Sequence, residues 1–340
     1  MANLREPSAT FNRDLFVGAR WFAGKRRAVA EIRAAARLAP AGADGAAVEL
    51  VDVAYADGGM ERYALALRDG GECAGSDPLW PALARESGIE VRGRSRFLAE
   101  DISNTVVLLD DAHVLKLYRR PEPGDHPEVE LLGALEGSPH APALEGRLER
   151  DGVTHVSVQA FVPGEPVGWE RLIAALAAGD PAPGLPTQLA HVTAILHHTL
   201  AERLGATEDG LQRVHGDLHV GQFLRSGQTL VVVDWEGRPS LTLEERRRPR
   251  PVLQDLASLR LSLAHAARAA HRRSPGFDWR SWSAAARDEA LGAYGDVDRE
   301  LLHALEVEAE LAELEYARQW LPEWLYVPQD VLPFVREARP

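Results

Sequence analysis

The pattern of apolar and polar residues predicts strands in the first half of the chain. Alternating or continuous apolar runs predict five strands, at residues 48–55, 61–67, 105–109, 113–118 and 154–161. The first pair flanks Asp57-Gly58-Gly59 and the second pair flanks Asp110-Asp111, so each pair predicts an antiparallel hairpin. A helix is predicted to begin near Pro127.

Helical periodicity dominates the second half. Amphipathic patterns predict four long helices, at residues 186–204, 252–271, 282–293 and 298–320. On the last of these the pattern places Ala304, Val307, Leu311 and Leu314 on the core-facing stripe. The strand-rich and helical halves meet at Val162-Pro163-Gly164. The chain is therefore predicted to be an α+β protein with three parts, residues 1–95, 96–162 and 163–340.

Composition narrows the classes of function. The net charge of -13 argues against a nucleic-acid partner or an anionic membrane surface, because phosphates would be repelled. Cys73 is the single cysteine and cannot form an internal disulfide, which favours a reducing compartment. The sequence has neither a signal-peptide pattern nor an apolar run of the ~20 residues that a membrane span needs. A cytoplasmic protein is predicted.

The most informative segment runs from His215 through Asp217 to Gln222, HGDLHVGQ, and is followed by an apolar strand that ends at Asp234 in DWEG. Phosphoryl transfer from ATP needs a carboxylate beside the attacking hydroxyl and oxygen ligands for Mg²⁺. Asp217 suits the first task, and Gln222 with Asp234 suits the second. An isolated HGD tripeptide is more often a turn than a site, but the whole combination favours a kinase.

A kinase also needs a cation on the nucleotide phosphates. Lys116 lies in an apolar strand, and Glu130 in the following helix is predicted to be its ion-pair partner. The alternative is an edge-strand lysine that points to solvent. Two more segments are predicted to bind the nucleotide. One is the hairpin turn with Ser103, Asn104 and Thr105, and the other is the segment before the break between the halves, with Gln159, Ala160 and Phe161.

Two further charged segments have alternative interpretations. Asp255 could tether the catalytic loop, or it could act as a first-turn acid that interacts with the helix dipole. The run Arg246-Arg247-Arg248 is predicted to be a solvated charge run rather than a phosphate clamp.

These motifs together resemble a known family. HGDLHVGQFL, beginning at His215, and VVVDWEG, ending at Gly237, are similar to the aminoglycoside-phosphotransferase-like kinases, and in particular to actinobacterial maltokinases. RWFAGK, beginning at Arg20, resembles the start of the maltokinase N-terminal cap, and VLKLYRR, beginning at Val114, resembles its nucleotide lobe. The resemblance extends over nearly the whole chain.

The resemblance implies a bilobal protein-kinase-like fold with an N-terminal cap subdomain at residues 1–95. It also implies an intermediate nucleotide-binding β lobe at 96–162 and a helical lobe at 163–340 with the catalytic loop and acceptor site. By this resemblance Asp217 is the catalytic base, Gln222 and Asp234 are magnesium ligands, and Lys116 binds phosphate. Gln222 replaces the asparagine usual in the superfamily, as it does in maltokinases.

The acceptor is predicted from the C-terminal helix. This chain reads EYARQWLPEW from Glu315, where maltokinases have an Asn-Arg pair, so a changed acceptor pocket is expected. Maltokinases are also longer than this chain, which favours a smaller sugar. Carboxylates beside the core stripe favour an amino sugar, although these glutamates could instead pair with arginines or face water. The predicted acceptor-binding residues are His219, Glu236, Glu308, Glu315, Gln319, Trp320 and Glu323.

The sequence thus predicts ATP- and Mg²⁺-dependent phosphorylation of a sugar, with glucosamine converted to glucosamine 6-phosphate, as in the glucosamine-phosphorylating branch that this sequence resembles. A maltokinase that forms maltose 1-phosphate is the first alternative. A catalytically inactive kinase fold that senses sugar or nucleotide is an alternative of another class, and an aminoglycoside-resistance enzyme is a third.

Overall fold

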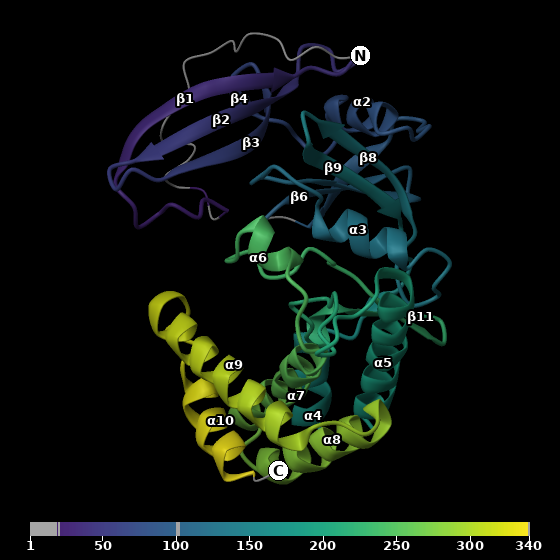
Figure 1. Cartoon of the computed structure of the whole chain (residues 1–340), viewed down its shortest axis with the longest axis vertical. Coiled ribbons are helices and arrows are strands. Elements are labelled where there is room, and N and C mark those ends of the chain that lie inside the picture. Colours follow the sequence, from purple (N-terminus) through teal and green to yellow (C-terminus); the bar gives the residue numbers. More distant parts are fainter. Residues whose placement is uncertain (1–18, 20, 100–102, 339–340) are drawn as a thin grey trace. The chain divides into compact units, whose positions relative to one another are not determined.

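The computed structural model describes residue 19, residues 21–99 and residues 103–338, and these form two compact units. Unit 1 contains the described residues up to Val129 together with Ala143–Phe161. Unit 2 contains Glu130–Pro142 and the described residues from Val162 onwards (Figure 1). Arg20 and residues 100–102, which belong to the predicted cap and nucleotide lobe, lie outside the described residues.

Unit 1 is built from two antiparallel sheets. The first has the order β1-β2-β3-β4, with bounds Val29–Leu38, Ala47–Tyr55, Met60–Arg68 and Gly71–Glu72. The second has the order β5-β6-β7-β9-β8, with bounds Ser95–Ala99, Thr105–Leu109, His113–Leu117, Val153–Ala160 and Leu144–Arg150. Helix α2 (Leu79–Glu86) lies between them in sequence, and α3 (Pro127–Ala134) follows β7. The two hairpins predicted from the sequence are β2-β3 and β6-β7.

The two sheets of unit 1 share one hydrophobic core. Leu50 of β2, Trp80 of α2 and Val107 of β6 belong to the same cluster of buried residues. A backbone hydrogen bond from Ala64 of β3 to the carbonyl oxygen of Arg119, just after β7, joins the sheets directly at 2.9 Å. Residues before and after position 95, which the sequence analysis separates, therefore pack as one body.

Unit 2 combines a small sheet with long helices. The sheet has the order β10-β11-β12, with bounds Glu165–Pro166, Phe223–Ser226 and Thr229–Val232. The long helices are α5 (Leu185–Leu204), α7 (Leu253–Arg273), α8 (Trp279–Tyr294) and α9 (Arg299–Trp320), and their existence was predicted. The shorter ones are α4 (Trp169–Ala177), α6 (Leu243–Arg247), α10 (Tyr326–Glu337) and the 3₁₀ turn η1 (Val220–Gln222).

Helix α7 is the centre of unit 2. It packs against α4, α5, α8, α9 and α10, and most of its residues are buried. Its many alanines allow this close approach, because a small side chain lets neighbouring helices come near on several faces. Charged residues are buried on it as well, Asp255 and Arg260 among them. Each of these charges needs a partner inside unit 2.

The predicted inner face of α9 was wrong in part. Leu314 is buried as predicted, but Leu311 is 42% exposed and Ala304 is also exposed. The other buried positions are Leu302, Glu306, Glu310 and Ala317. The helix is turned so that two glutamates face inward, because cations on α7 and α8 pair with them and offset the cost of burying their charge.

Among the described residues, the longest apolar helical stretches fall short of what a membrane-spanning helix requires.

Candidate active site

Asp255 holds the start of the catalytic loop. Its carboxylate accepts hydrogen bonds from the amides of His215 at 2.8 Å and Gly216 at 2.9 Å, and it lies 3.0 Å from Nε2 of His197. Burial alone would raise the pKa of Asp255, but the hydrogen bond and charge of His197, with His215 and Gly216, lower it. Asp255 also lies in the first turn of α7. It is therefore both a tether of the loop and a first-turn acid, the two alternatives that the sequence offered.

Asp217 follows directly in this loop and is half-buried. Its amide donates to Nδ1 of His215 at 3.3 Å, while Nε2 of His215 lies 3.0 Å from the carbonyl oxygen of Val233. Both contacts are satisfied when neutral His215 carries its proton on Nε2. The Asp217 carboxylate faces Arg238, with 3.5 Å between Oδ1 and Nε. A partly exposed carboxylate of this kind can accept the proton of an incoming hydroxyl.

Gln222 and Asp234 converge as the sequence predicts. The amide nitrogen of Gln222 lies 3.2 Å from Oδ2 of Asp234, although the two residues are twelve positions apart. Asp234 follows β12 with a φ of 66°, in the left-handed region that aspartate tolerates better than most residues. One carboxylate and one amide oxygen suit Mg²⁺, which proteins hold through few side chains together with substrate phosphates. These residues fit a magnesium site when the Gln222 amide is turned so that its oxygen, in place of its nitrogen, faces Asp234.

An aromatic wall stands beside the catalytic loop. The ring of Trp169, the first residue of α4, lies 5.6 Å from the ring of His219, 6.2 Å from that of His265 and 6.2 Å from that of Trp324. A Cβ atom at Gly221 would come within 2.8 Å of the His219 ring and 3.1 Å of Trp169 Nε1, so only glycine permits this approach. Aromatic side chains with a few polar groups are typical of a small-molecule site.

Acidic residues of α9 lie on the same side of unit 2. Glu310 is fully buried and contacts Nε2 of His265 at 2.7 Å. Burial alone would lower the pKa of His265, but Glu310, with a smaller contribution from Glu313, raises it. Burial raises the pKa of Glu313, and the nearby charges of Glu310 and Asp217 raise it further. Glu313 is thus close enough to Asp217 for their charges to interact.

His219 lies between the predicted metal ligand Gln222 and this wall. Its Nδ1 accepts a hydrogen bond from the amide of Gly221 at 3.0 Å, and its Nε2 lies 3.4 Å from the side-chain amide of Gln222. Burial lowers the pKa of His219, although the charges of Asp217 and Asp234 oppose this effect. A neutral His219 can offer a ring N–H to an acceptor hydroxyl.

In unit 1 Lys116 is buried and paired, but not with the predicted glutamate. Its Nζ lies 2.8 Å from Oε1 of Glu128, whose side chain is completely buried. Glu130, the first residue of unit 2, instead pairs with Arg213 of the same unit at 2.9 Å. Residues two positions apart point to nearly opposite sides of a helix, so only one of the two glutamates can face the sheet.

The other predicted nucleotide-binding residues have mixed environments. Asn104 is buried and accepts a hydrogen bond from the amide of Arg119 at 3.2 Å, while Ser103 is exposed and Thr105 begins β6. The amide of Ala160 already donates to Ala143 at 2.9 Å and that of Phe161 to Ala112 at 2.7 Å. Gln159 is buried and donates to Glu128 at 3.4 Å.

The predicted acceptor residues of α9 and the segment after it face outward. The exposed ones are Glu308, Glu315, Gln319, Trp320 and Glu323. Gln319 donates to Glu315 on the preceding turn. Glu236 is buried, and its Oε2 lies 3.7 Å from Nη1 of Arg246. The side chain of Arg246 is only 7% exposed. The prediction that it belongs to a solvated charge run was therefore wrong.

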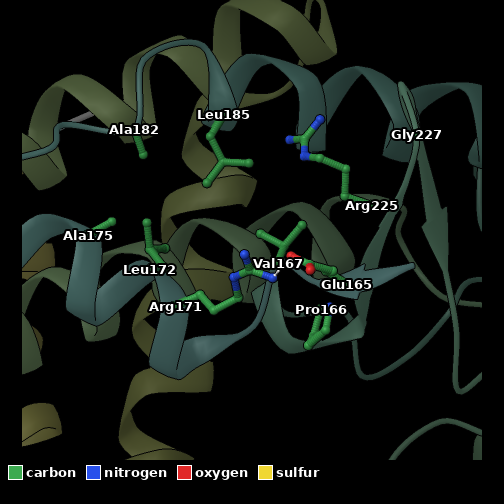
Figure 2. Close-up of a pocket in the computed structure, with 10 residues that line it drawn as sticks. All are labelled: Glu165, Pro166, Val167, Arg171, Leu172, Ala175, Ala182, Leu185, Arg225 and Gly227. Carbon is green, nitrogen blue, oxygen red and sulfur yellow. Dashed lines mark hydrogen bonds and ion pairs between the residues drawn. The ribbon is translucent and has the colours of Figure 1, made fainter. Parts of the chain in front are cut away.

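A separate pocket of about 370 Å³ lies between β10, α4, the start of α5 and β11 (Figure 2). Figure 2 shows Glu165 and Arg171 side by side, and these two exposed side chains form an ion pair. Arg225 at the opposite rim donates to Gln188 at 3.1 Å. Asp217, Gln222, Asp234 and Lys116 are not among its lining residues, so its volume does not mark the candidate active site.

Sequence reasoning missed several residues of this region: Trp169, Arg238, His265, Glu310 and Glu313. Arg238 carried a usable signal, since it comes directly after DWEG. His265 and the glutamates lie on two helices whose contact no local pattern reveals. A search for acidic residues near Asp217 in sequence would not have found them.

Comparisons with known proteins identify relatives of this chain. Residues 17–76 match the maltokinase N-terminal cap domain family. The chain is 28% identical to a glucosamine kinase of Mycolicibacterium smegmatis over 314 residues, covering 70% of this chain and 78% of that protein. It is 37% identical to a glucosamine kinase of Streptacidiphilus jiangxiensis over 137 residues, covering 35% of this chain and 31% of that protein.

Solved structures give the fold. A structure titled glucosamine kinase, crystal form B, has a TM-score of 0.71 at 25% identity and covers 96% of this chain and 98% of that one. A glucosamine kinase in complex with glucosamine, ADP and inorganic phosphate has a TM-score of 0.65 at 24% identity, covering 96% and 99%. The chain therefore has the fold of these kinases, with a maltokinase-type N-terminal cap, and the predicted fold class is confirmed.

Proposed function

We propose that this protein is an ATP-dependent sugar kinase whose acceptor is glucosamine, phosphorylated on its 6-hydroxyl group. The observation that carries the proposal is the position of Asp217 on the loop that Asp255 tethers, near the aromatic wall and the acidic residues of α9. The 6-hydroxyl is the primary and least hindered alcohol of the sugar. The glucosamine kinases similar to this chain support the choice.

In the proposed reaction Asp217 orients the acceptor hydroxyl and accepts its proton. Arg238, which faces Asp217 at 3.5 Å, turns to the incoming phosphoryl group when substrate separates the two side chains. Lys116, fixed by Glu128, binds the α- and β-phosphates of ATP. Gln222 and Asp234 would hold Mg²⁺, which neutralises charge on the transferred phosphoryl group when bound.

The charges around the acceptor favour an amino sugar. Asp217, Glu310 and Glu313 bring three carboxyl groups to one side of unit 2, against His265 and Arg238. An ammonium group would reduce the mutual repulsion of these carboxylates, and a charge-assisted hydrogen bond to one of them would orient the ring. Trp169 and His219 would cover the sugar from the other side.

The test is an acceptor screen with radiolabelled ATP across glucosamine, N-acetylglucosamine, glucose, maltose and an aminoglycoside. N-acetylglucosamine is the matched control, because acetylation removes the charge and leaves the 6-hydroxyl in place. We expect turnover of glucosamine well above that of the others, with the phosphate on oxygen 6 by phosphorus NMR. If maltose were the preferred acceptor, the proposal of glucosamine would be wrong and the protein would be a maltose kinase.

The role of Asp217 is tested separately with Asp217→Asn. We expect turnover to fall by about 10²- to 10⁴-fold, because the amide cannot accept the hydroxyl proton. ATP affinity, measured by calorimetry, should stay close to that of the unmodified protein. Turnover near the original rate would exclude Asp217 as the base, whichever acceptor is used.

A further inference from the structure

A second cavity, of about 230 Å³, lies in unit 2 between α7, α8, α9 and α10. It shares no lining residue with the catalytic loop or the aromatic wall. Its polar lining comes from Arg260, Arg287, Asp288, Arg299, His303 and Glu306, and the remaining lining residues are apolar apart from backbone. Arg260 and Arg287 form its buried part, whereas Asp288 and Arg299 are exposed at its rim.

The buried part of this cavity has surplus positive charge. Arg260 is 7% exposed, Arg287 3% and Glu306 1%. The single carboxylate of Glu306 lies 3.2 Å from Nη1 of Arg260 and 2.5 Å from Nη2 of Arg287. Two guanidinium groups thus share one carboxylate. Arg299 and Asp288 at the rim cancel each other, so one positive charge is left over in a protein whose net charge is -13.

The hydrogen bonds of the two arginines are also incomplete. Among the described residues, Nε of Arg260 and Nε of Arg287 are buried with no hydrogen-bond partner. A buried N–H group without a partner costs free energy, and the cost is larger when the group is charged. Both arginines line the cavity, so their guanidinium groups are candidates to bind an acceptor there.

The electrostatics of Arg260 agree with this geometry. Burial lowers its pKa to about 10, and the neighbouring Arg287 and Arg299 act in the same direction, against Glu306 and Asp288. A negative charge in the cavity would reverse this effect.

We infer that this cavity binds a phosphate group, through the guanidinium groups of Arg260 and Arg287 with Arg299 at the entrance. A tetrahedral oxyanion presents several acceptor oxygens to the planar fork of arginine and supplies the missing negative charge. The cavity has the volume of about eight water molecules, so it has room for the ion and for a small group attached to it. The phosphate can be inorganic or belong to a small phosphate ester.

The matched variants are Arg260→Met and Arg268→Met. Both remove one positive charge from α7, but Arg268 pairs with Asp330 at 2.6 Å and does not line the cavity. Arg260→Met leaves Glu306 paired with Arg287. Phosphate bound at the catalytic centre affects both variants alike, so their difference reports on the cavity alone.

The experiment measures thermal unfolding of the full chain against inorganic phosphate at constant pH and ionic strength. A ligand that binds only the folded protein raises the midpoint with its concentration. We expect this rise in the unmodified protein and in Arg268→Met. In Arg260→Met the phosphate concentration needed for the same rise should be at least ~10-fold higher, as expected for losing a charged hydrogen bond. An equal rise in both variants would overturn the inference.

Arg299→Ala gives an independent measurement if Arg260→Met does not fold. Arg299 is exposed, so its removal should leave the fold intact and weaken phosphate binding by about two- to fivefold. No change with Arg299→Ala would count against the cavity. Sulfate and glucosamine 6-phosphate distinguish the sources: a larger Arg260-dependent rise with the ester identifies a phosphate ester, and an equal rise identifies the free ion.

Discussion

Glu128 and Glu306 are both completely buried glutamates, but they differ in how their charge is balanced. Glu128 in unit 1 faces one cation, Lys116, at 2.8 Å. It also accepts hydrogen bonds from Tyr118, from Ser157 at 3.2 Å and from Gln159 at 3.4 Å. Charge and hydrogen bonds are both satisfied. Such a centre holds a side chain in one position, which a phosphate-binding lysine requires.

Glu306 in unit 2 faces two cations, Arg260 and Arg287. Within the described part of the chain, Nε of each arginine and Oε1 of Glu306 are buried without a hydrogen-bond partner. This centre has one positive charge too many and hydrogen bonds still to make. The comparison indicates that a balanced buried charge positions a residue, whereas an unbalanced one beside a cavity can bind a ligand. Variants of the two centres test this difference, and two further measurements extend it to the acidic residues of α9.

The largest effect is expected for Glu128→Gln. Lys116 would remain buried without a counter-charge, which costs about 3 kcal/mol in the free energy of unfolding. Displacement of its amine should lower kcat/KM for ATP by about 10²-fold. The control is Glu130→Gln, whose partner is Arg213, and it should leave the ATP kinetics unchanged. If Glu130→Gln lowered kcat/KM for ATP and Glu128→Gln did not, Glu130 would be the functional partner of Lys116.

A smaller effect is expected for Glu313→Gln. Loss of this carboxylate near Asp217 should raise KM for glucosamine by about 10- to 100-fold, the range for a charged hydrogen bond. Steady-state kinetics with Glu308→Gln provide the comparison, because Glu308 is exposed on the same helix. If Glu308→Gln has the larger effect, the acceptor lies along the face that the sequence predicted.

The pair of His265 and Glu310 predicts a dependence of stability on pH. The pKa of His265 is raised in the folded protein. Protonated His265 therefore contributes stability that is fully present below its unfolded pKa of about 6.5. This contribution is lost as pH rises through the folded pKa. Urea unfolding should show the difference between the unmodified protein and Glu310→Gln shrinking above about pH 6.5. A constant difference would mean that His265 stays neutral.

The smallest effect on stability is expected for Arg260→Met in chloride buffer. Removing the surplus cation leaves one arginine for one glutamate, so the free energy of unfolding should change by less than about 1 kcal/mol or increase. Urea denaturation measures this directly. A loss of about 3 kcal/mol, the value expected at Glu128, would show that the two centres are balanced in the same way.

The catalytic loop could be predicted from the sequence because its chemistry is local. Asp217 and Gln222 lie on one short loop, and a single strand returns Asp234 to Gln222. Long helices were predicted for a similar reason, since their periodicity extends over many residues. Their short neighbours were not: α2, α4 and α10 have too few turns, or an internal proline in α10, to give a clear period.

Facing directions could not be predicted in the same way. A pattern that counts only apolar residues assigns Glu306 and Glu310 to the solvent side. They face inward because they pair with Arg260, Arg287 and His265 on other helices. The roles of the site residues stay predictions until the variants are measured.

By itself the sequence determined the fold class, the cap, the long helices and the carboxylate and amide groups of the catalytic loop. These depend on spacing along the chain. Only the tertiary structure decided that Lys116 pairs with Glu128, that α9 buries its acidic face, and that two arginines share one glutamate. Pairing between buried charges depends on which helices pack together, and that information is spread over the whole chain.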